Sequence, residues 1–132
     1  MLDTNVVSDA ILPQPRPGVL RGIQRHSGEI AIASVVWHEL RFGIERLQPS
    51  HRRDDLETYL ADISGGMPIL DYTSAAAEWH ARERARLMAR GQTPPILDGQ
   101  IAAIAAVNNL TLVTFNARDF NRFEGLRVES WF

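Results

Sequence analysis

The sequence predicts a three-layer α/β/α fold in which helices cover both faces of a mostly parallel sheet of four to five strands. Short runs rich in isoleucine and valine alternate with segments whose apolar residues recur every three or four positions. Strands separated by helices are typical of a parallel sheet that is buried on both faces. Hydrophobic residues make up 45% and charged residues 23% of the 132 residues, as in a globular domain. We expect a single domain over residues 1–132.

Two strands and four helices are expected in the first half of the chain. Thr4 and Ser34 are good N-cap residues, because their hydroxyls can accept hydrogen bonds from free helix N–H groups. Prolines at 13, 15 and 17 favour an extended loop. The expected elements are a short strand at Leu2, a helix from Thr4 to Ile11, a helix over 18–26, a strand over 30–33, a helix over 34–47 and a helix over 49–63.

Three strands, two long helices and a short helix near Phe120 are expected in the second half of the chain. Gly65 and Gly66 should end the preceding helix, and Arg90 suits the negative end of a helix dipole. The expected elements are a strand over 68–70, a helix over 73–90, a helix over 97–107, a strand over 110–113 and a weaker strand over 126–128.

The composition excludes several chemistries. Cysteine is absent, which excludes disulfides, a thiol nucleophile and thiolate metal sites, and fits a reducing cytoplasm. Lysine is absent too, which excludes Schiff-base catalysis and a P-loop. No apolar run is long enough for a transmembrane helix, and no secretory signal precedes the first helix. The net charge of −2 does not indicate nucleic-acid binding over the whole surface.

Four of the 16 acidic residues fall where a parallel sheet would gather them. Asp3 directly follows the first strand, and Glu39 lies one turn into the helix after the second. Asp98 opens the helix over 97–107, on the side that carries its apolar residues, and Asp119 follows the strand over 110–113. Ligands of such sheets bind beyond the carboxyl ends of the strands. We therefore expect these four carboxylates to lie together.

Crowded carboxylates repel each other, so that one of them takes up a proton unless a cation intervenes. Mg²⁺ and Mn²⁺ prefer carboxylate oxygens and retained water molecules as ligands. Such an ion activates water and neutralises the charge of a phosphoryl group. The pattern therefore predicts a Mg²⁺ site, with Mn²⁺ as a substitute, that is suited to phosphodiester hydrolysis.

Four segments resemble the PIN-domain ribonucleases, and specifically the VapC-type toxins of bacterial toxin–antitoxin modules. They are LDTNVVSD at 2–9, WHELRFGIERL at 37–47, LDGQIAAIAA at 97–106 and LVTFNARDFNRFEGLRVESW at 112–131. The resemblance implies a PIN fold and a metal-dependent endoribonuclease that forms a homodimer. It also implies neutralisation by a VapB-like antitoxin, and assembly on DNA through that antitoxin.

The same resemblance assigns roles to individual residues. Asp3, Glu39 and Asp98 match the first three acids of the family, and Asp3 and Asp98 would bind the metal ion. Asp119 is expected to be the fourth acid and an outer ligand, beside a polar Asn116, although many relatives carry an acid at the position of Asn116. The residues expected to support the site are Thr4, Asn5 and Thr114.

Other polar residues are interpreted more simply. Arginines that could contact RNA or an antitoxin are Arg41, Arg46, Arg82, Arg86, Arg90 and Arg118. The acidic residues Asp54, Asp55, Glu57, Glu78 and Glu83 are expected on solvated helix faces. The histidines at 26, 51 and 80 are expected on the surface, so that no histidine-based site competes with the acids.

The sequence argues against two other enzymes and leaves two alternatives open. A haloacid-dehalogenase-like phosphohydrolase would need a second aspartate at Asn5 and a lysine, and both are missing. A flap-endonuclease-like DNA nuclease needs a helical insertion for which 132 residues leave no room. A PIN-fold binding module without catalysis, or a solitary PIN nuclease without an antitoxin, stays open.

Overall fold

The computed structural model describes all 132 residues, which form seven helices and four short strands. In chain order the elements are α1 (Thr4–Asp9), α2 (Pro17–Arg25), β1 (Ile32–Ala33), α3 (Ser34–Glu45), α4 (His51–Gly66), β2 (Ile69–Leu70), α5 (Ser74–Ala89), α6 (Ile96–Val107), β3 (Thr111–Val113), α7 (Ala117–Phe120) and β4 (Arg127–Glu129). No helix has both the length and the apolar character that crossing a membrane requires.

Leu2 joins two pairs of parallel strands into one sheet. In the first pair, Ile32 of β1 lies opposite Ile69 of β2, and in the second, Leu112 of β3 lies opposite Val128 of β4. Leu2 forms parallel bridges with both Ile32 and Val113. The order across the sheet is therefore β2, β1, the Leu2 segment, β3 and β4, all parallel, which confirms the predicted sheet.

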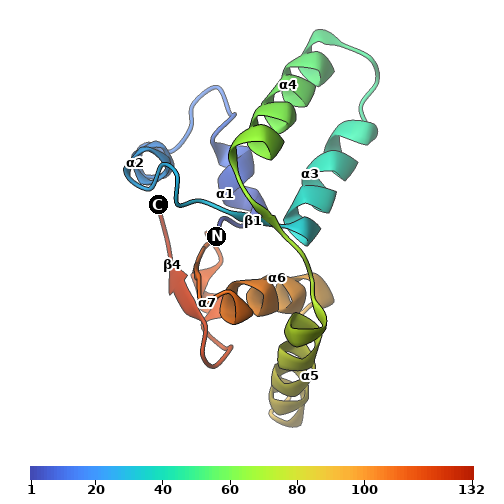
Figure 1. Cartoon of the computed structure of the whole chain (residues 1–132), viewed down its shortest axis with the longest axis vertical. Coiled ribbons are helices and arrows are strands. Elements are labelled where there is room, and N and C mark those ends of the chain that lie inside the picture. The colour runs from blue at the N-terminus through green and yellow to red at the C-terminus, as the bar shows by residue number, and fades with distance from the viewer.

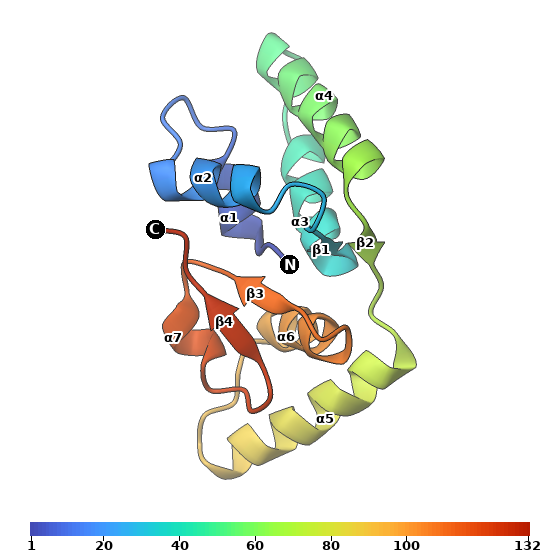
Figure 2. The same cartoon turned by 60° about the vertical axis from the view of Figure 1, so that its left-hand side comes forward.

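Helices pack on both sides of this sheet. α6 contacts β1 and β3, and α5 packs across α6 on the side away from β3 (Figures 1 and 2). In Figure 2, α1 and α2 lie on the other side of β3 from α6. The largest fully buried side chains come from every layer, among them Leu2, Ile32, Ile104 and Leu112. The predicted α/β class is thus confirmed.

The N-caps of two helices differ from those predicted. Asp3, not Thr4, caps α1, because the backbone of Asp3 is extended and its carboxylate accepts the N–H of Thr4. The N-cap of α3 is Ala33, and Ser34 is the first helical residue. α4 continues through Gly66, three residues beyond the predicted end, because the N–H of Met67 still bonds to the carbonyl of Ile63.

Two polar residues of α5 that were predicted to be exposed are buried. His80 is 5% exposed and Glu83 is 8% exposed. They complete a buried stripe with Ala76 and Leu87, at the spacing of one helix face. Glu83 accepts hydrogen bonds from Arg86 and from the backbone N–H of Glu124, which offset the cost of its burial.

Candidate active site

Asp3 lies at the centre of the candidate site and is only 6% exposed. One carboxylate oxygen accepts the N–H of Thr4 at 2.8 Å, and the other accepts the hydroxyl of Thr114 at 2.8 Å. Burial raises the pKa of Asp3, the two hydrogen bonds partly counteract this rise, and the charge of Glu39 adds to it. The sheet therefore holds Asp3 in a fixed orientation and in an environment that disfavours its charge.

Glu39 is half-buried on α3 and is linked to Asp3 through Thr4. The hydroxyl of Thr4 donates a hydrogen bond to Glu39, while the backbone N–H of Thr4 donates to Asp3. The first residue of α1 thus holds carboxylates from two separate segments of the chain.

Asp98 is half-buried in the first turn of α6. Burial is the largest cause of its raised pKa, followed by the charges of Asp3, Asp119 and Glu39. The other three predicted acids therefore lie near enough for their charges to act on Asp98. No hydrogen bond or ion pair of the Asp98 carboxylate contributes to its pKa, so its oxygens are free.

Asp119 lies at the outer edge of the site, on α7, where it is exposed. Its carboxylate is 3.6 Å from the guanidinium of Arg122. Asn116 is the N-cap of α7, and its backbone N–H donates to the hydroxyl of Thr114 at 3.0 Å. Asn5 accepts the N–H of Phe115 at 3.5 Å. Asn116 and Asn5 therefore order the backbone that follows β3.

The donors of the site suit a hard divalent ion. No three carboxylates or histidines are close enough together to hold one metal ion. Mg²⁺, however, is usually held by one or two carboxylates and completes its shell with water. Asp3 and Asp98 are the two carboxylates whose pKa values burial and neighbouring charge raise, so a cation between them would relieve the greatest repulsion.

The predicted contact arginines divide into two groups. Arg41 is ion-paired with Glu45 and with Glu57, and Arg86 is ion-paired with Glu83. Arg82 and Arg118 are exposed and form no recorded ion pair or hydrogen bond. Arg46 and Arg90 are exposed as well and form no ion pair, so four arginines of the predicted set stay available to a phosphate: Arg46, Arg82, Arg90 and Arg118.

A groove of about 670 Å³ runs from the acidic site between α1, α3 and α4. Thr4 and Glu39 line its end at the site, and half of its lining residues are hydrophobic. Leu12, Leu40 and Leu56 are among these apolar residues, and Arg46 and Arg52 add positive charge. The groove therefore offers an apolar surface that continues directly into the acidic site.

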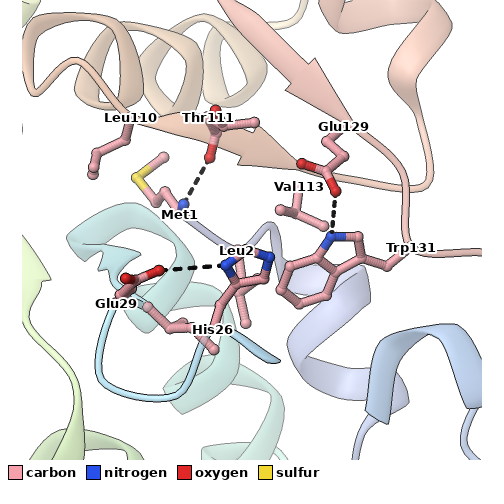
Figure 3. A pocket seen from close by; sticks show the side chains of 10 residues that line it. Met1, Leu2, His26, Glu29, Leu110, Thr111, Val113, Glu129 and Trp131 are labelled. Atoms are coloured by element: carbon pink, nitrogen blue, oxygen red, sulfur yellow. Dashed lines mark hydrogen bonds and ion pairs between the residues drawn. The ribbon is translucent and has the colours of Figure 1, made fainter. Parts of the chain in front are cut away.

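A smaller cavity of about 200 Å³ lies elsewhere and contains none of the four acids (Figure 3). Its polar groups bond mainly to one another or to the backbone. The ammonium group of Met1 donates to the carbonyl of Thr111 at 2.7 Å, and the indole of Trp131 donates to Glu129 at 3.0 Å. The ring of His26 stacks on Trp131, with ring centroids 5.6 Å apart. This cavity resembles a partly filled core more than a site.

One buried polar pair beside α6 was not predicted from the sequence. His80 of α5 lies 2.9 Å from the hydroxyl of Tyr72, measured at Nδ1, and its other ring nitrogen has no hydrogen-bond partner. The helical spacing could have predicted the burial of His80, because position 80 falls on the same helix face as Ala76 and Leu87.

Comparisons with known proteins agree with this geometry. Residues 1–126 match the PIN domain family. The chain is 35% identical to the tRNA(fMet)-specific endonuclease VapC of Shigella flexneri over 99% of this chain and 96% of that protein. It is 32% identical to ribonuclease VapC2 of Haemophilus influenzae over the same shares.

Solved structures show the same fold. The crystal structure of VapBC2 from Rickettsia felis bound to a promoter DNA fragment superposes with a TM-score of 0.86 at 27% identity, covering 100% of this chain and 98% of that one. DNA-bound VapBC from Salmonella typhimurium gives a TM-score of 0.85 at 27% identity, covering 100% and 97%. With the four acids at the carboxyl edge of its parallel sheet, the chain belongs to the PIN domain family and, within it, to the VapC ribonucleases of toxin–antitoxin systems.

Proposed function

We propose that the chain is a Mg²⁺- or Mn²⁺-dependent endoribonuclease, that it acts as the toxin of a VapBC-type module, and that a cognate antitoxin neutralises it. The observation that carries this proposal is the gathering of four carboxylates from distant segments of the chain, with Asp3, Glu39 and Asp119 near enough for their charges to act on Asp98. Structural networks seldom gather like charges without a compensating cation, whereas metal-dependent nuclease sites require them.

Each residue of the site has a distinct part in the proposed reaction. Asp3 and Asp98 bind the metal ion, with Asp3 oriented by Thr114 and Thr4. Bound there, the ion supplies charge neutralisation for the phosphate and activation of water. Glu39 lies beside them to orient water and accept its proton, and Asp119 contributes from the exposed edge. The exposed guanidinium groups of Arg82 and Arg118 are available to hold the RNA backbone.

The proposed substrate is structured RNA. One of the relatives is named as specific for tRNA(fMet), and another simply as a ribonuclease. The net charge of −2 means that a general attraction between the protein and RNA is weak. Selection therefore depends on local contacts around the site.

The proposal is tested by cleavage of labelled transfer RNA by antitoxin-free protein in the presence of Mg²⁺. We expect cleavage by the wild type, loss of cleavage with EDTA, and loss with Asp98→Asn, which removes one metal-facing charge with little change in shape. Asp62→Asn on the exposed face of α4 is the matched control and should cleave normally. Undiminished cleavage in EDTA would contradict the metal mechanism. A wild type that binds no Mn²⁺ and cleaves no RNA would favour a binding module instead.

We propose that the antitoxin binds in the groove between α1, α3 and α4 and extends a cation into the acidic site. The support is the continuity of an apolar groove with a cluster of carboxylates, since an amphipathic helix followed by an arginine matches both surfaces. A complex in which no antitoxin group approaches Asp3, Glu39 or Asp98 would contradict the second part.

Two leucines of similar exposure test the groove. Leu12 lies in it and is 50% exposed, whereas Leu20 of α2 is 46% exposed and lies outside it. The antitoxin would be encoded by a short reading frame next to that of the toxin, and it can be co-expressed with the toxin. We expect Leu12→Asp to abolish capture of this antitoxin, and Leu20→Asp to leave capture intact. Equal capture by both variants would exclude the groove, and the absence of any such reading frame would favour a solitary nuclease.

We also propose that the toxin forms a homodimer and joins a larger assembly on DNA through the antitoxin. The structural relatives include toxin–antitoxin complexes bound to DNA fragments. Sedimentation of the purified chain, alone and with the antitoxin and promoter DNA, measures both steps. A monomer at all concentrations, or DNA binding by the toxin alone, would contradict them.

A further inference from the structure

Asp98 differs from the other acids in how it is held. Asp3 accepts two hydrogen bonds, Glu39 accepts one from Thr4, and Asp119 lies near a guanidinium group. The carboxylate of Asp98 has no such partner, and only burial and neighbouring charges shift its pKa. The position of its carboxylate therefore depends on the position of the helix turn that carries it.

Local capping does not hold this turn either. The N-cap of α6 is Pro95, which forms no side-chain cap bond. An acid in the position of Asp98 commonly reaches back to the N–H of the N-cap residue, but a proline has no N–H. This leaves the carboxylate of Asp98 free for the site, and it leaves the first turn of α6 to be located by tertiary contacts.

The contact that locates this turn comes from His80 of α5. A Cβ atom built on Gly99 would lie 2.1 Å from Nε2 and 2.6 Å from Cδ2 of His80. The imidazole therefore touches the backbone of α6 at the residue next to Asp98, and only glycine permits this approach. α5 and α6 also form the most extensive helix–helix contact of the fold.

The other side of the imidazole is fixed by Tyr72. Nδ1 of His80 lies 2.9 Å from the Tyr72 hydroxyl, whereas Nε2 is buried with no partner. A buried unpaired N–H is rarer and more costly than a buried unpaired lone pair, so we assign the proton to Nδ1, which donates to the Tyr72 oxygen. Burial and the charge of Arg84 lower the pKa of His80, which agrees with a neutral ring.

We propose that His80 is a positioning residue for the metal site: held by Tyr72, its imidazole packs on Gly99 and sets the place of Asp98 relative to Asp3. This inference rests on the proposed function, because it assumes that Asp98 binds the metal ion. His80 itself would contact neither the metal ion nor RNA. Its effect passes through the backbone of α6.

The test is Mn²⁺ affinity, measured by electron paramagnetic resonance of the free ion without RNA, together with thermal unfolding. Gly99→Ala should weaken Mn²⁺ binding by about tenfold or more, because the added methyl group would clash with the imidazole and displace the turn that carries Asp98. Gly65→Ala, a helical position with open space around it, is the matched control and should bind normally. His80→Ala should weaken binding less than Gly99→Ala, because it removes a support without introducing a clash.

The double variant separates positioning from general damage. In Gly99→Ala with His80→Ala, the added methyl group occupies space that the ring has left, so Mn²⁺ affinity should recover above that of Gly99→Ala alone. If Gly99→Ala does not fold, the comparison of His80→Ala with the exposed His51→Ala decides, and equal affinity of these two would overturn the inference. ¹⁵N resonances of His80 should show the Nδ1–H tautomer, and an Nε2–H tautomer would contradict the packing.

Three further outcomes distinguish failure of the positioning role from failure of the proposed function. A folded Gly99→Ala with wild-type Mn²⁺ affinity would overturn the inference while leaving the proposed nuclease intact. A double variant that is weaker than either single one would show that the two residues act independently, which also overturns it. A wild type that binds no Mn²⁺ would overturn the proposed function itself, and with it the positioning role.

Discussion

Replacing Asp3 with asparagine and with alanine separates the charge of this carboxylate from its hydrogen bonds. Asparagine is nearly isosteric, so its carbonyl oxygen can still accept the N–H of Thr4 and its amide can donate to the hydroxyl of Thr114. Alanine removes both partners. Both variants should lose Mg²⁺-dependent cleavage, since both lose a metal-binding oxygen that carries charge.

The two variants should differ in stability. Loss of an N-cap side chain costs about 0.5–2 kcal/mol. Loss of a partner for a buried hydroxyl costs about 1–3 kcal/mol, and the lower end applies because Thr114 keeps a hydrogen bond from the N–H of Asn116. Asp3→Ala should therefore be about 1.5–3 kcal/mol less stable than Asp3→Asn. Asp3→Asn should be at least as stable as the wild type in metal-free buffer, because it relieves a buried charge that Glu39 repels.

The pH dependence gives a second check on the same variants. The raised pKa of Asp3 means that the folded state binds its proton more tightly than the unfolded state does. The free energy of unfolding should therefore fall as the pH rises from the ordinary aspartate pKa, about 4, through the raised value, and stay lower above it. The advantage of Asp3→Asn over the wild type should grow across that window.

Urea unfolding in EDTA, followed by circular dichroism from about pH 4 to about pH 8, measures these differences. Equal midpoints for Asp3→Asn and Asp3→Ala would show that the two hydrogen bonds contribute nothing to stability. An Asp3→Asn protein that is less stable than the wild type at neutral pH would refute the reasoning about charge.

Two further measurements probe the site and the core. Mn²⁺ affinity should rise with pH through the mildly acidic range, because the raised pKa values of Asp3 and Asp98 mean that binding must expel protons; calorimetric titration giving a flat affinity would contradict this. Gly22→Ala should lower the free energy of unfolding by about 1–3 kcal/mol, because its Cβ would lie 2.3 Å from the ring of Trp131. Gly65→Ala, with no atom within 4 Å of its Cβ, serves as the control, and equal unfolding midpoints would refute the clash.

The order of elements and the choice of the four acids followed from local sequence. Apolar runs separated by helical patterns predict a parallel sheet, and residues just past strand ends then lie at one edge of it. Asp3 and Asp98 could be selected in this way because each begins a helix, where position is tied to the chain itself. The predicted helices match the observed ones closely, since periodicity and end signals act within a few residues of each other.

The sequence therefore determined the fold class and which carboxylates meet, whereas the burial and orientation of polar side chains were decided by tertiary contacts. Glu83 is buried because a backbone N–H 41 positions away, at Glu124, satisfies it, and no local pattern encodes such a partner. His80 was predicted on the surface, but it is buried against Gly99 of α6. Asp3 caps α1 in place of Thr4, and Thr114, which directly follows β3, holds its other carboxylate oxygen. A side chain's cost of burial depends on the partners it finds, and these come together only when distant segments pack.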